Sequence, residues 1–510
     1  MPSLNMRKPR PNFWPVIFLV VIFVGSCILI FSLYFKKSVF TGKDRSIAVL
    51  PFVHQPKDSS SEYFEDGMTD EIISRLSKIP GFKVIARGSV MGYKGQNIDI
   101  EQTAKELHVS SILEGVVSKN GNRVHIHVNL FDAGTGKSIW EEDYDRDMNE
   151  IFSLQNELAS QIAENLDSEW QKPGGSSSAQ RPTRNLEAYD QYLQGRYYWN
   201  KGNPVSLRNA IHFFEQSIRL DSDYAKAYSG LADCYSALGY GSYDLPARAF
   251  LKAESAALKA IVLDSGLADP HASLGYIKFY YYWDWAGAEA EFLKSIRLNP
   301  SYVLAYDAYC YYLTAMERFP EARLAIEKAI QMDPFSAKIS TDYGFCLYYE
   351  KKYDEAMAAL NSSLLLNPGY PLTYIWMARC YQVKKMYKEA IEENKHALSV
   401  NKNWPVAFAA IGNVYGASGQ MEESKGILDT MLSLAGSIYV TPYGLALVYA
   451  GRHEFDSAFK YLDMALVDRS NWLVWLKLDP RWQAISRDTR YHEMLEKIGL
   501  DKIGELRHKD

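Results

Sequence analysis

The fold is decided by a stretch that reads ERFPEARLAIEKAIQMDP at residues 317–334 and returns as KKYDEAMAALNSSLLLNP at residues 351–368. The two copies lie 34 residues apart, and the same step continues through the second half of the chain. Its clearest markers are small residues: Ala288, Ala322, Ala356, Ala390, Ser424 and Ala458. A constant period of 34 residues predicts a solenoid of helix-turn-helix units, in which each unit buries its apolar face against the next.

Each marker has a physical role in packing two helices. A small residue lets the two helices of a unit approach closely, and a proline ends the second helix because it cannot continue the hydrogen-bond ladder. This end position keeps the 34-residue step but loses proline in the later units: Pro300, Pro334, Pro368, Lys402, Gly436 and Ser470.

The pattern resembles the tetratricopeptide-repeat (TPR) family, whose units carry small, aromatic, alanine and proline residues at set positions. The matching residues are Gly344, Gly412, Tyr381, Tyr415, Ala322, Ala356, Ala390, Ala458 and Phe292. The unit around Ser424 departs from the pattern, because it lacks both the alanine and the proline. The resemblance implies an α-solenoid of about eight helical hairpins over residues 186–470.

The formal net charge of −5 is unevenly distributed, because residues 1–45 carry +6 and leave −11 for the remainder. An acidic body argues against nucleic-acid binding, which needs a basic surface. Three of the five cysteines, Cys234, Cys346 and Cys380, occupy equivalent positions in different units. Such positions should lie ~8–10 Å apart, too far for a disulfide bond, so we expect buried free thiols.

Residues 13–35 contain no charged side chain, and residues 16–35 alone could span the hydrocarbon core of a membrane as a helix. We therefore predict a short tail at 1–12, one transmembrane helix at 13–35 and a single-pass protein of the bacterial inner membrane. The body would lie outside the cytoplasm. The alternatives are a cleavable signal peptide and a lipoprotein anchored at Cys27, since VGSC at 24–27 resembles a lipobox.

Residues 46–168 follow a different pattern, with short apolar runs between helical segments. We predict a small α/β domain with strands at 46–53, 82–86, 111–117, 124–130 and 139–144 and helices at 63–79, 101–107 and 151–166.

Several motifs of this domain resemble a TolB-like N-terminal domain, which recurs in bacteria ahead of TPR units. They are SIAVLPF at 46–52, YFEDGMTDE at 63–71, VIAR at 84–87, YKG at 93–95, LEG at 113–115, DAGTG at 132–136 and Trp140. The resemblance implies an effector ahead of the module, either a class III adenylate cyclase, a kinase or a winged-helix DNA-binding domain. Only residues 1–12 precede the predicted membrane helix, so we expect this chain to lack such an effector.

Two further segments flank the solenoid. Residues 171–185 (QKPGGSSSAQRPTRN) are rich in proline, glycine and serine and predict a flexible linker. Residues 471–510 contain Trp472, Trp475 and Trp482. We expect these rings to cover the apolar face of the last unit, because a solenoid needs a cap at its end.

No stretch predicts an enzyme. GTGKS at 134–138 lacks the first glycine of a phosphate-binding loop, where Phe131 stands, and it lies between two predicted strands. The acidic residues at 62–71 fit the start of a helix, where carboxylates offset the helix dipole, better than a cation site. His125 and His127 share one strand face without a third ligand, which favours a solvated face. We therefore predict no catalytic residue, metal or cofactor.

The remaining candidate is the concave surface of the solenoid. In TPR arrays the first helix of each unit lines a groove, and carrying those positions over gives Tyr276, Phe279, Tyr311, Phe345, Tyr348, Arg379 and Asn413. Aromatic rings can anchor a peptide, and the polar side chains can hold its backbone or carboxylate. We predict a membrane-anchored, non-enzymatic adaptor that binds a protein or peptide in this groove. The alternative is a sensory or regulatory subunit that signals to a separate cyclase, kinase or transcription regulator.

Overall fold

The computed structural model describes residues 45–53, 62–167 and 182–503 of the 510-residue chain. From Ser46 onward the chain forms one compact unit, and every contact below lies within it. The predicted tail at 1–12, Cys27 and most of the predicted linker at 171–185 lie outside the described residues.

The prediction of a single-pass inner-membrane protein has to be corrected. Among the described residues, none of the helices is both long and apolar enough to cross a membrane. The predicted span at 13–35 lies outside the described residues. The membrane assignment therefore fails for the part of the chain that the structure describes, and the location in an inner membrane with the body outside the cytoplasm is not retained.

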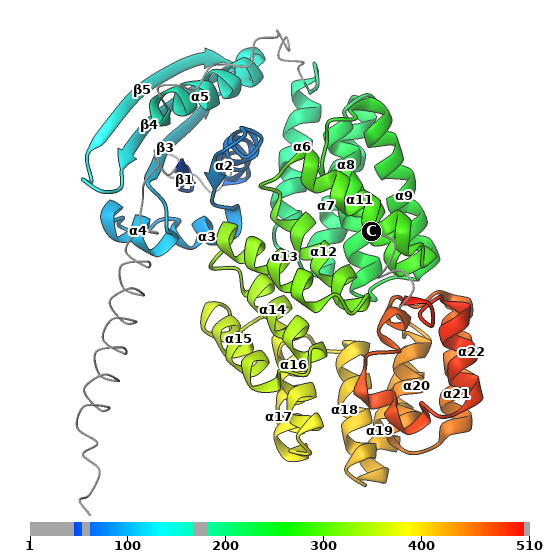
Figure 1. Ribbon diagram of the computed structural model, residues 1–510. Helices are drawn as coiled ribbons and strands as arrows, with labels where there is room; N and C mark the ends of the chain where they lie inside the picture. The colour runs from blue at the N-terminus through cyan, green and yellow to red at the C-terminus, as the bar shows by residue number, and fades with distance from the viewer. Residues whose placement is uncertain (1–44, 54–61, 168–181, 504–510) are drawn as a thin grey trace, which may run out of the picture. The chain divides into compact units, whose positions relative to one another are not determined.

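The N-terminal part forms a sheet with the strand order β2-β1-β3-β4-β5 (Figure 1). β1 pairs in parallel with β2 and β3, whereas β3, β4 and β5 form an antiparallel meander. The strands are β1 (Ser46–Val49), β2 (Lys83–Val84), β3 (Ser111–Asn120), β4 (Arg123–Asp132) and β5 (Ser138–Asp147). Apolar and polar residues alternate along β4 with the apolar ones buried, which confirms the predicted half-buried strand.

Helices cover the two faces of this sheet to different extents. α2 (Glu62–Leu76) and α5 (Ile151–Leu166) pack their apolar residues on one face, in a core shared with the solenoid. The other face is covered near β1 by α3 (Arg87–Val90) and α4 (Ile100–Leu107). Over β4 and β5 that second face carries polar side chains, so it stays open.

Residues 186–468 form a series of antiparallel helix pairs, each packed on the next (Figure 1), and the short helices η5 (Asn471–Trp475), η6 (Pro480–Ile485) and α22 (Thr489–Lys497) follow them. The pairs are α6 (Leu186–Trp199) with α7 (Pro204–Leu220), α8 (Ala225–Tyr240) with α9 (Pro246–Leu263), α10 (Asp269–Ile277) with α11 (Trp285–Leu298), α12 (Val303–Ala315) with α13 (Phe319–Met332), α14 (Ala337–Tyr349) with α15 (Tyr353–Leu366), α16 (Pro371–Val383) with α17 (Tyr387–Val400), α18 (Pro405–Ala417) with α19 (Met421–Leu434), and α20 (Pro442–Gly451) with α21 (Phe455–Asp468).

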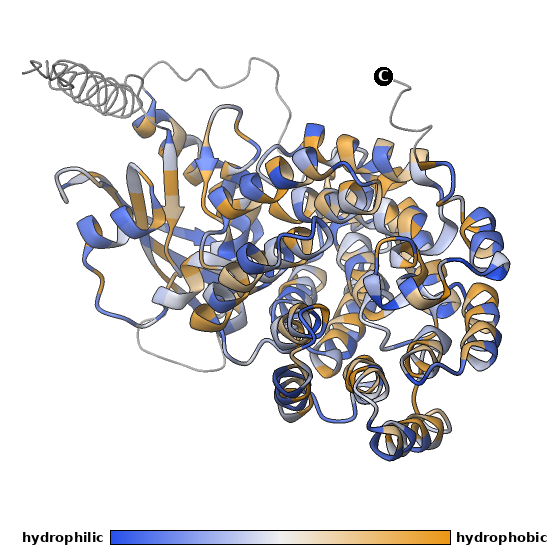
Figure 2. Ribbon diagram, turned by 60° about the horizontal axis from the view of Figure 1, so that its bottom comes forward, coloured by the Kyte–Doolittle hydropathy of each residue, from blue (hydrophilic) through white to orange (hydrophobic). Residues whose placement is uncertain are grey.

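The small residues of the 34-residue step lie where two helices approach, since all six are at most 1% exposed. Figure 2 shows hydrophobic and hydrophilic residues side by side on these helices, as expected for units that bury one face. The predicted buried thiols are confirmed for Cys234, Cys310, Cys346 and Cys380.

A left-handed residue follows the first helix of each regular pair. The series has positive φ angles and a step of 34: Trp283 (56°), Glu317 (56°), Lys351 (65°), Lys385 (61°), Gly419 (80°) and His453 (60°). A left-handed residue reverses the backbone and lets the following amides cap the helix. A side chain is strained in this conformation, so packing must hold the turn wherever glycine is absent.

Candidate functional site

The residues predicted to line a groove lie on the first helices of successive pairs, with Phe279 in the π-helical turn η4 (Lys278–Tyr282) that continues α10. The structure buries six of the seven: Phe279 (0% exposed), Tyr311 (3%), Phe345 (1%), Tyr348 (1%), Arg379 (4%) and Asn413 (2%). Tyr276 is half-buried. These side chains are not open to solvent, because the C-terminal segment of the same chain covers several of them.

Trp475, in the short helix η5 (Asn471–Trp475), is seated among rings of the first helices. Its centroid lies 4.8 Å from that of Phe345, in an edge-to-face arrangement, and 5.1 Å from that of Tyr349, nearly parallel. Phe279 lies at 5.9 Å and Tyr311 at 6.4 Å. Such geometries contribute about 0.5–1.5 kcal/mol per pair beyond the buried area, so this one side chain is a principal anchor of the segment.

Arg379 holds the segment at a second point. Its guanidinium lies 4.1 Å from the ring centroid of Trp376 and 5.3 Å from that of Trp472, so it is stacked against an indole of the solenoid and one of the segment. Its Nη1 is 3.9 Å from Oδ2 of Asp479. Burial alone would raise the pKa of Asp479, but Arg481 and Arg379 outweigh it and lower that pKa.

Two of the predicted groove residues hold the helices of the solenoid together. Asn413 donates from Nδ2 to the Leu447 carbonyl of α20 at 2.7 Å and accepts from Gln382 of α16 at 2.7 Å. Tyr311 donates its hydroxyl to Asp342 and accepts from the Tyr240 hydroxyl at 3.2 Å. These polar groups are already satisfied within the protein.

The C-terminal segment, residues 471–503, reaches helix pairs far from the last one. Asn471 donates to the Tyr240 carbonyl at the end of α8 at 2.8 Å, and Trp285 of α11 donates to the Ile498 carbonyl at 3.2 Å. Of the three tryptophans predicted to cap the last pair, Trp482 donates to the Tyr443 hydroxyl of α20 at 2.7 Å. Trp472 and Trp475 also reach residues of earlier helix pairs, Arg379 and Phe345 among them.

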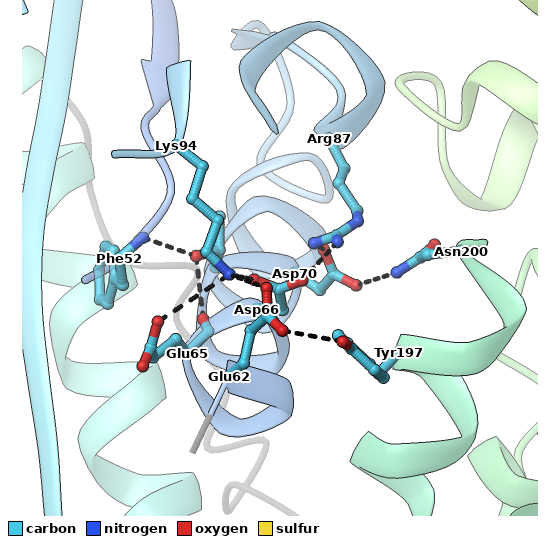
Figure 3. A network of polar contacts seen from close by, with 10 residues as sticks. Phe52, Glu62, Glu65, Asp66, Asp70, Arg87, Lys94, Tyr197 and Asn200 are labelled. Atoms are coloured by element: carbon cyan, nitrogen blue, oxygen red, sulfur yellow. Dashed lines mark hydrogen bonds and ion pairs between the residues drawn. The ribbon is translucent and has the colours of Figure 1, made fainter. Parts of the chain in front are cut away.

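Figure 3 shows a second polar site, where the acidic residues of α2 meet cations of the sheet domain and polar residues of α6. Arg87 contacts Asp66 at 2.8 Å and Asp70 at 3.0 Å. Lys94 contacts Asp66 at 2.7 Å and Glu62 at 3.0 Å.

The same carboxylates accept hydrogen bonds from the solenoid: Tyr197 donates to Glu62 at 2.8 Å and Asn200 to Asp70 at 3.0 Å. The predicted dipole role applies to Glu62 and Glu65, which lie in the first turn of α2. The acidic residues further along α2 instead join the sheet domain to the solenoid.

Glu71 and Lys226 add an ion pair between α2 and α8, with Nζ 2.7 Å from one carboxylate oxygen. Burial would raise the pKa of Glu71, but the charges of Lys226 and Arg75 outweigh it and lower that pKa. Burial lowers the pKa of Lys226 because a buried ammonium loses its hydration.

The other sequence candidates have structural roles. GTGKS lies at the turn between β4 and β5, where Gly136 has φ 64° and the Thr135 amide donates to Asp132 at 2.9 Å. His127 lies 3.2 Å from Asp143 and 3.6 Å from Glu141, and His125 lies 3.5 Å from Asp143, all on exposed strands. Within the described residues, no group of three or more ligating side chains is placed to hold a metal ion.

Sequence reasoning missed the residues that complete both polar sites. Trp475 and Asp479 contact residues of helices a hundred or more positions earlier, beyond the reach of a local pattern. Arg87 and Lys226 were likewise not matched to the acids of α2. The available signal was the high density of tryptophan after the last unit. Such large rings need an extensive apolar surface to pack against.

Comparisons with known proteins agree with this two-part architecture. Residues 43–161 match the family described as HilA/YgeH-like transcriptional regulator, second domain, and residues 347–414 match a tetratricopeptide repeat. The chain is thus similar to a HilA-like domain in its N-terminal part and to TPR units in its second half. The first match covers most of the domain at 46–168 under a different family description, so its TolB-like character stays a prediction.

Sequence relatives match only part of the chain. Putative adenylate cyclase 3 of Rhizobium meliloti is 35% identical over 187 residues, which is 37% of this chain and 32% of that protein. Transcriptional regulator HilA of Salmonella typhimurium is 25% identical over 151 residues, 29% of this chain and 26% of that protein. The chain therefore spans about a third or less of these relatives.

Among solved structures, Pseudomonas aeruginosa pilF is 18% identical with a TM-score of 0.31, covering 46% of this chain and 98% of that one. YrrB, a TPR protein with an unusual peptide-binding site, is 19% identical with a TM-score of 0.26, covering 39% of this chain and 96% of that one.

Proposed function

We propose that the protein is a non-enzymatic adaptor whose TPR solenoid receives a protein or peptide segment on its concave face. The observation that carries this proposal is the way that face holds residues 471–503. Rings of successive first helices receive Trp475, and Arg379 lies against Trp472 and 3.9 Å from the Asp479 carboxylate, which accepts hydrogen bonds from Arg481 of the same segment. A partner segment with two aromatic residues and a nearby acid could make the same contacts with these rings and with Arg379.

In the state described here the adaptor is closed, because its own segment fills the receiving surface. A tethered segment competes at an effective concentration of about 1 mM or more. A partner therefore reaches this surface only when the segment is weakened, or when the partner binds far more tightly. The seven groove residues take part in this proposal as the receptor of whichever segment is bound.

The test opens the surface in the full-length chain with the double variant Trp475→Ala/Asp479→Ala. Losing about 4 kcal/mol of segment binding is about a thousandfold, which brings competition down to micromolar peptide. A fluorescent synthetic peptide of residues 470–503 should bind this variant, measured by anisotropy, and should not bind the wild type. Trp140→Ala, in β5 of the sheet domain, is the matched control and should also fail to bind.

Circular dichroism must show that the double variant is folded. A folded double variant that leaves the peptide free would contradict the proposal. The milder single variant Asp479→Ala should bind the same peptide at higher concentration, so it provides a second test if the double variant unfolds.

A second candidate function is a regulatory subunit of a separate cyclase, kinase or transcription regulator. It is favoured by the match of residues 43–161 to a domain of transcriptional regulators and by a relative named as an adenylate cyclase. Deleting the gene should then change cellular cyclic AMP or the transcripts of a defined gene set. Unchanged levels of both would argue against this function.

A further inference from the structure

The open face of the N-terminal sheet carries a cavity of about 260 Å³ between β3, β4 and the loop that follows α3. Its polar lining includes Glu114 of β3 together with His127 and Asn129 of β4. Apolar side chains line much of the rest: Leu50, Pro51, Val53, Tyr93, Ile98 and Val116. This volume lies near the lower end of ligand pockets, so it suits a small molecule.

Glu114 is the unusual member of this lining. It is half-buried, and burial raises the pKa of its carboxyl, with no charge or hydrogen bond of the described residues acting against that rise. Among the described residues, Glu114 therefore lacks an ion-pair partner. A half-buried carboxylate gives up part of its hydration, and that loss is unfavourable unless another group replaces the water.

The surroundings of Glu114 add negative rather than positive charge. None of the residues that line the cavity is Lys or Arg. His127 is held by carboxylates of the next strand, with Nδ1 3.2 Å from Asp143 and Nε2 3.6 Å from Glu141. The cavity thus combines an uncompensated acid with an acidic rim.

The walls of the cavity are fixed before any ligand arrives. Tyr93 donates its hydroxyl to Glu106 of α4 at 2.7 Å, and Gln96 donates to the Gly92 carbonyl at 2.7 Å, which holds the loop. Asn129 accepts from Ser138 of β5 at 2.6 Å. A preformed wall loses little conformational entropy on binding.

We propose that this cavity binds a small organic cation, with an ammonium or guanidinium group at Glu114 and a short carbon body against Pro51, Ile98 and the Tyr93 ring. The cation supplies Glu114 with an ion-pair partner in place of the water that burial removes. The apolar residues of the wall favour a ligand that also carries a short hydrocarbon chain. This site is separate from the concave face of the solenoid and does not rest on the function proposed above.

The experiment uses two probes of nearly the same shape, butylguanidinium and neutral butylurea, in calorimetric titrations of the full-length chain. Butylguanidinium should bind, and butylurea should bind at least tenfold more weakly. Glu114→Gln should weaken butylguanidinium at least tenfold. The control Glu142→Gln removes the same charge from exposed β5 but on the other face of the sheet, opposite Val128, and should bind as the wild type does.

Three outcomes would overturn the inference. The first is no binding of butylguanidinium up to about 10 mM, and the second is equal binding by a folded Glu114→Gln variant. The third is binding of the tripeptide acetyl-Gly-Arg-Gly-amide without binding of butylguanidinium, which would assign the site to a basic protein partner.

Discussion

The solenoid holds two other parts of its own chain, mainly by different chemistry. Helix α2 of the sheet domain is attached through carboxylates, as in the contact of Glu71 with Lys226, whose side chain stays 18% exposed. The C-terminal segment is attached mainly through rings, with Trp475 only 2% exposed, and its Asp479 carboxylate lies 3.9 Å from Arg379. The strength of ion pairs at a partly hydrated interface depends on salt and pH, whereas the strength of buried aromatic contacts does not.

The two contacts therefore differ in how readily they can change. The α2 interface is adjustable by solution conditions, whereas the C-terminal segment leaves its aromatic contacts only at a large energetic cost. We therefore expect the attachment of the sheet domain to the solenoid to change with salt and pH, and the attachment of the C-terminal segment to stay unchanged.

Trp475→Ala should have the largest effect, because it removes the aromatic contacts between the C-terminal segment and the solenoid. Truncating a fully buried tryptophan costs about 3–5 kcal/mol, because the removed area and the cavity both count. Urea unfolding followed by circular dichroism should show this loss for the solenoid. Trp140→Ala, at a half-buried position of β5, should cost clearly less, and equal losses would contradict the role assigned to Trp475.

Lys226→Ala removes the ion pair between α2 and α8. It leaves the buried Glu71 carboxylate with Arg75, at 3.7 Å, as its ion-pair partner. Removing one partner of a buried pair costs about 3 kcal/mol, because the other charge stays desolvated. The double variant Glu71→Met/Lys226→Met should recover most of that loss, since no charge is left unpaired. A double variant as unstable as the single one would show that packing, not charge, holds α2.

A pH titration sharpens the comparison at the second contact between the sheet domain and the solenoid. There Ser89 of α3 donates to Asp333 at 2.5 Å, and burial raises the pKa of Asp333 from 3.8 to about 6. The folded protein binds this proton more tightly than the unfolded chain. The contribution is therefore complete below pH 4 and is lost as the pH rises through 6.

The expected loss is about 2–3 kcal/mol, at 1.36 kcal/mol for each pKa unit. The difference in unfolding free energy between wild type and Asp333→Asn should follow this curve. A difference that does not vary between pH 4 and 7 would contradict the assignment.

The smallest effect concerns the turns of the solenoid itself. Lys385 has φ 61°, a conformation that costs a side chain about 1–2 kcal/mol, part of which glycine returns as entropy of the unfolded chain. Lys385→Gly should therefore stabilise the solenoid by about 0.5–1 kcal/mol in thermal unfolding. The same change at Lys395, in the middle of α17, should destabilise it by a similar amount.

The 34-residue step predicted the helix pairs well because each pair contacts mainly its neighbours, so local spacing carries the information. The same step could not place Trp475, since the period ends at Ser470 and its contacts return to Phe279. The role of the seven first-helix positions as a groove stays a prediction, and the segment that contacts Phe279, Tyr311, Phe345 and Arg379 has no repeat of its own.

The acids of α2 show the same limit. Glu62 and Glu65 fit a local reason, the helix dipole, and they do lie in the first turn. Asp66 and Glu71 are paired with residues that the fold brings from elsewhere, Arg87 and Lys226. The left-handed turns were also missed, because only Gly419 of that series carries the residue type that would announce them.

The returning tail has a mechanical consequence. Repeat arrays normally fray from their ends, one unit at a time, because each unit depends only on its neighbours. Here the C-terminal segment follows α21 and forms hydrogen bonds with the ends of α8 and α11. The last units therefore cannot unfold without breaking contacts with earlier helix pairs. Pulled from its C-terminus, such a chain should resist as one body and then yield in a single cooperative step.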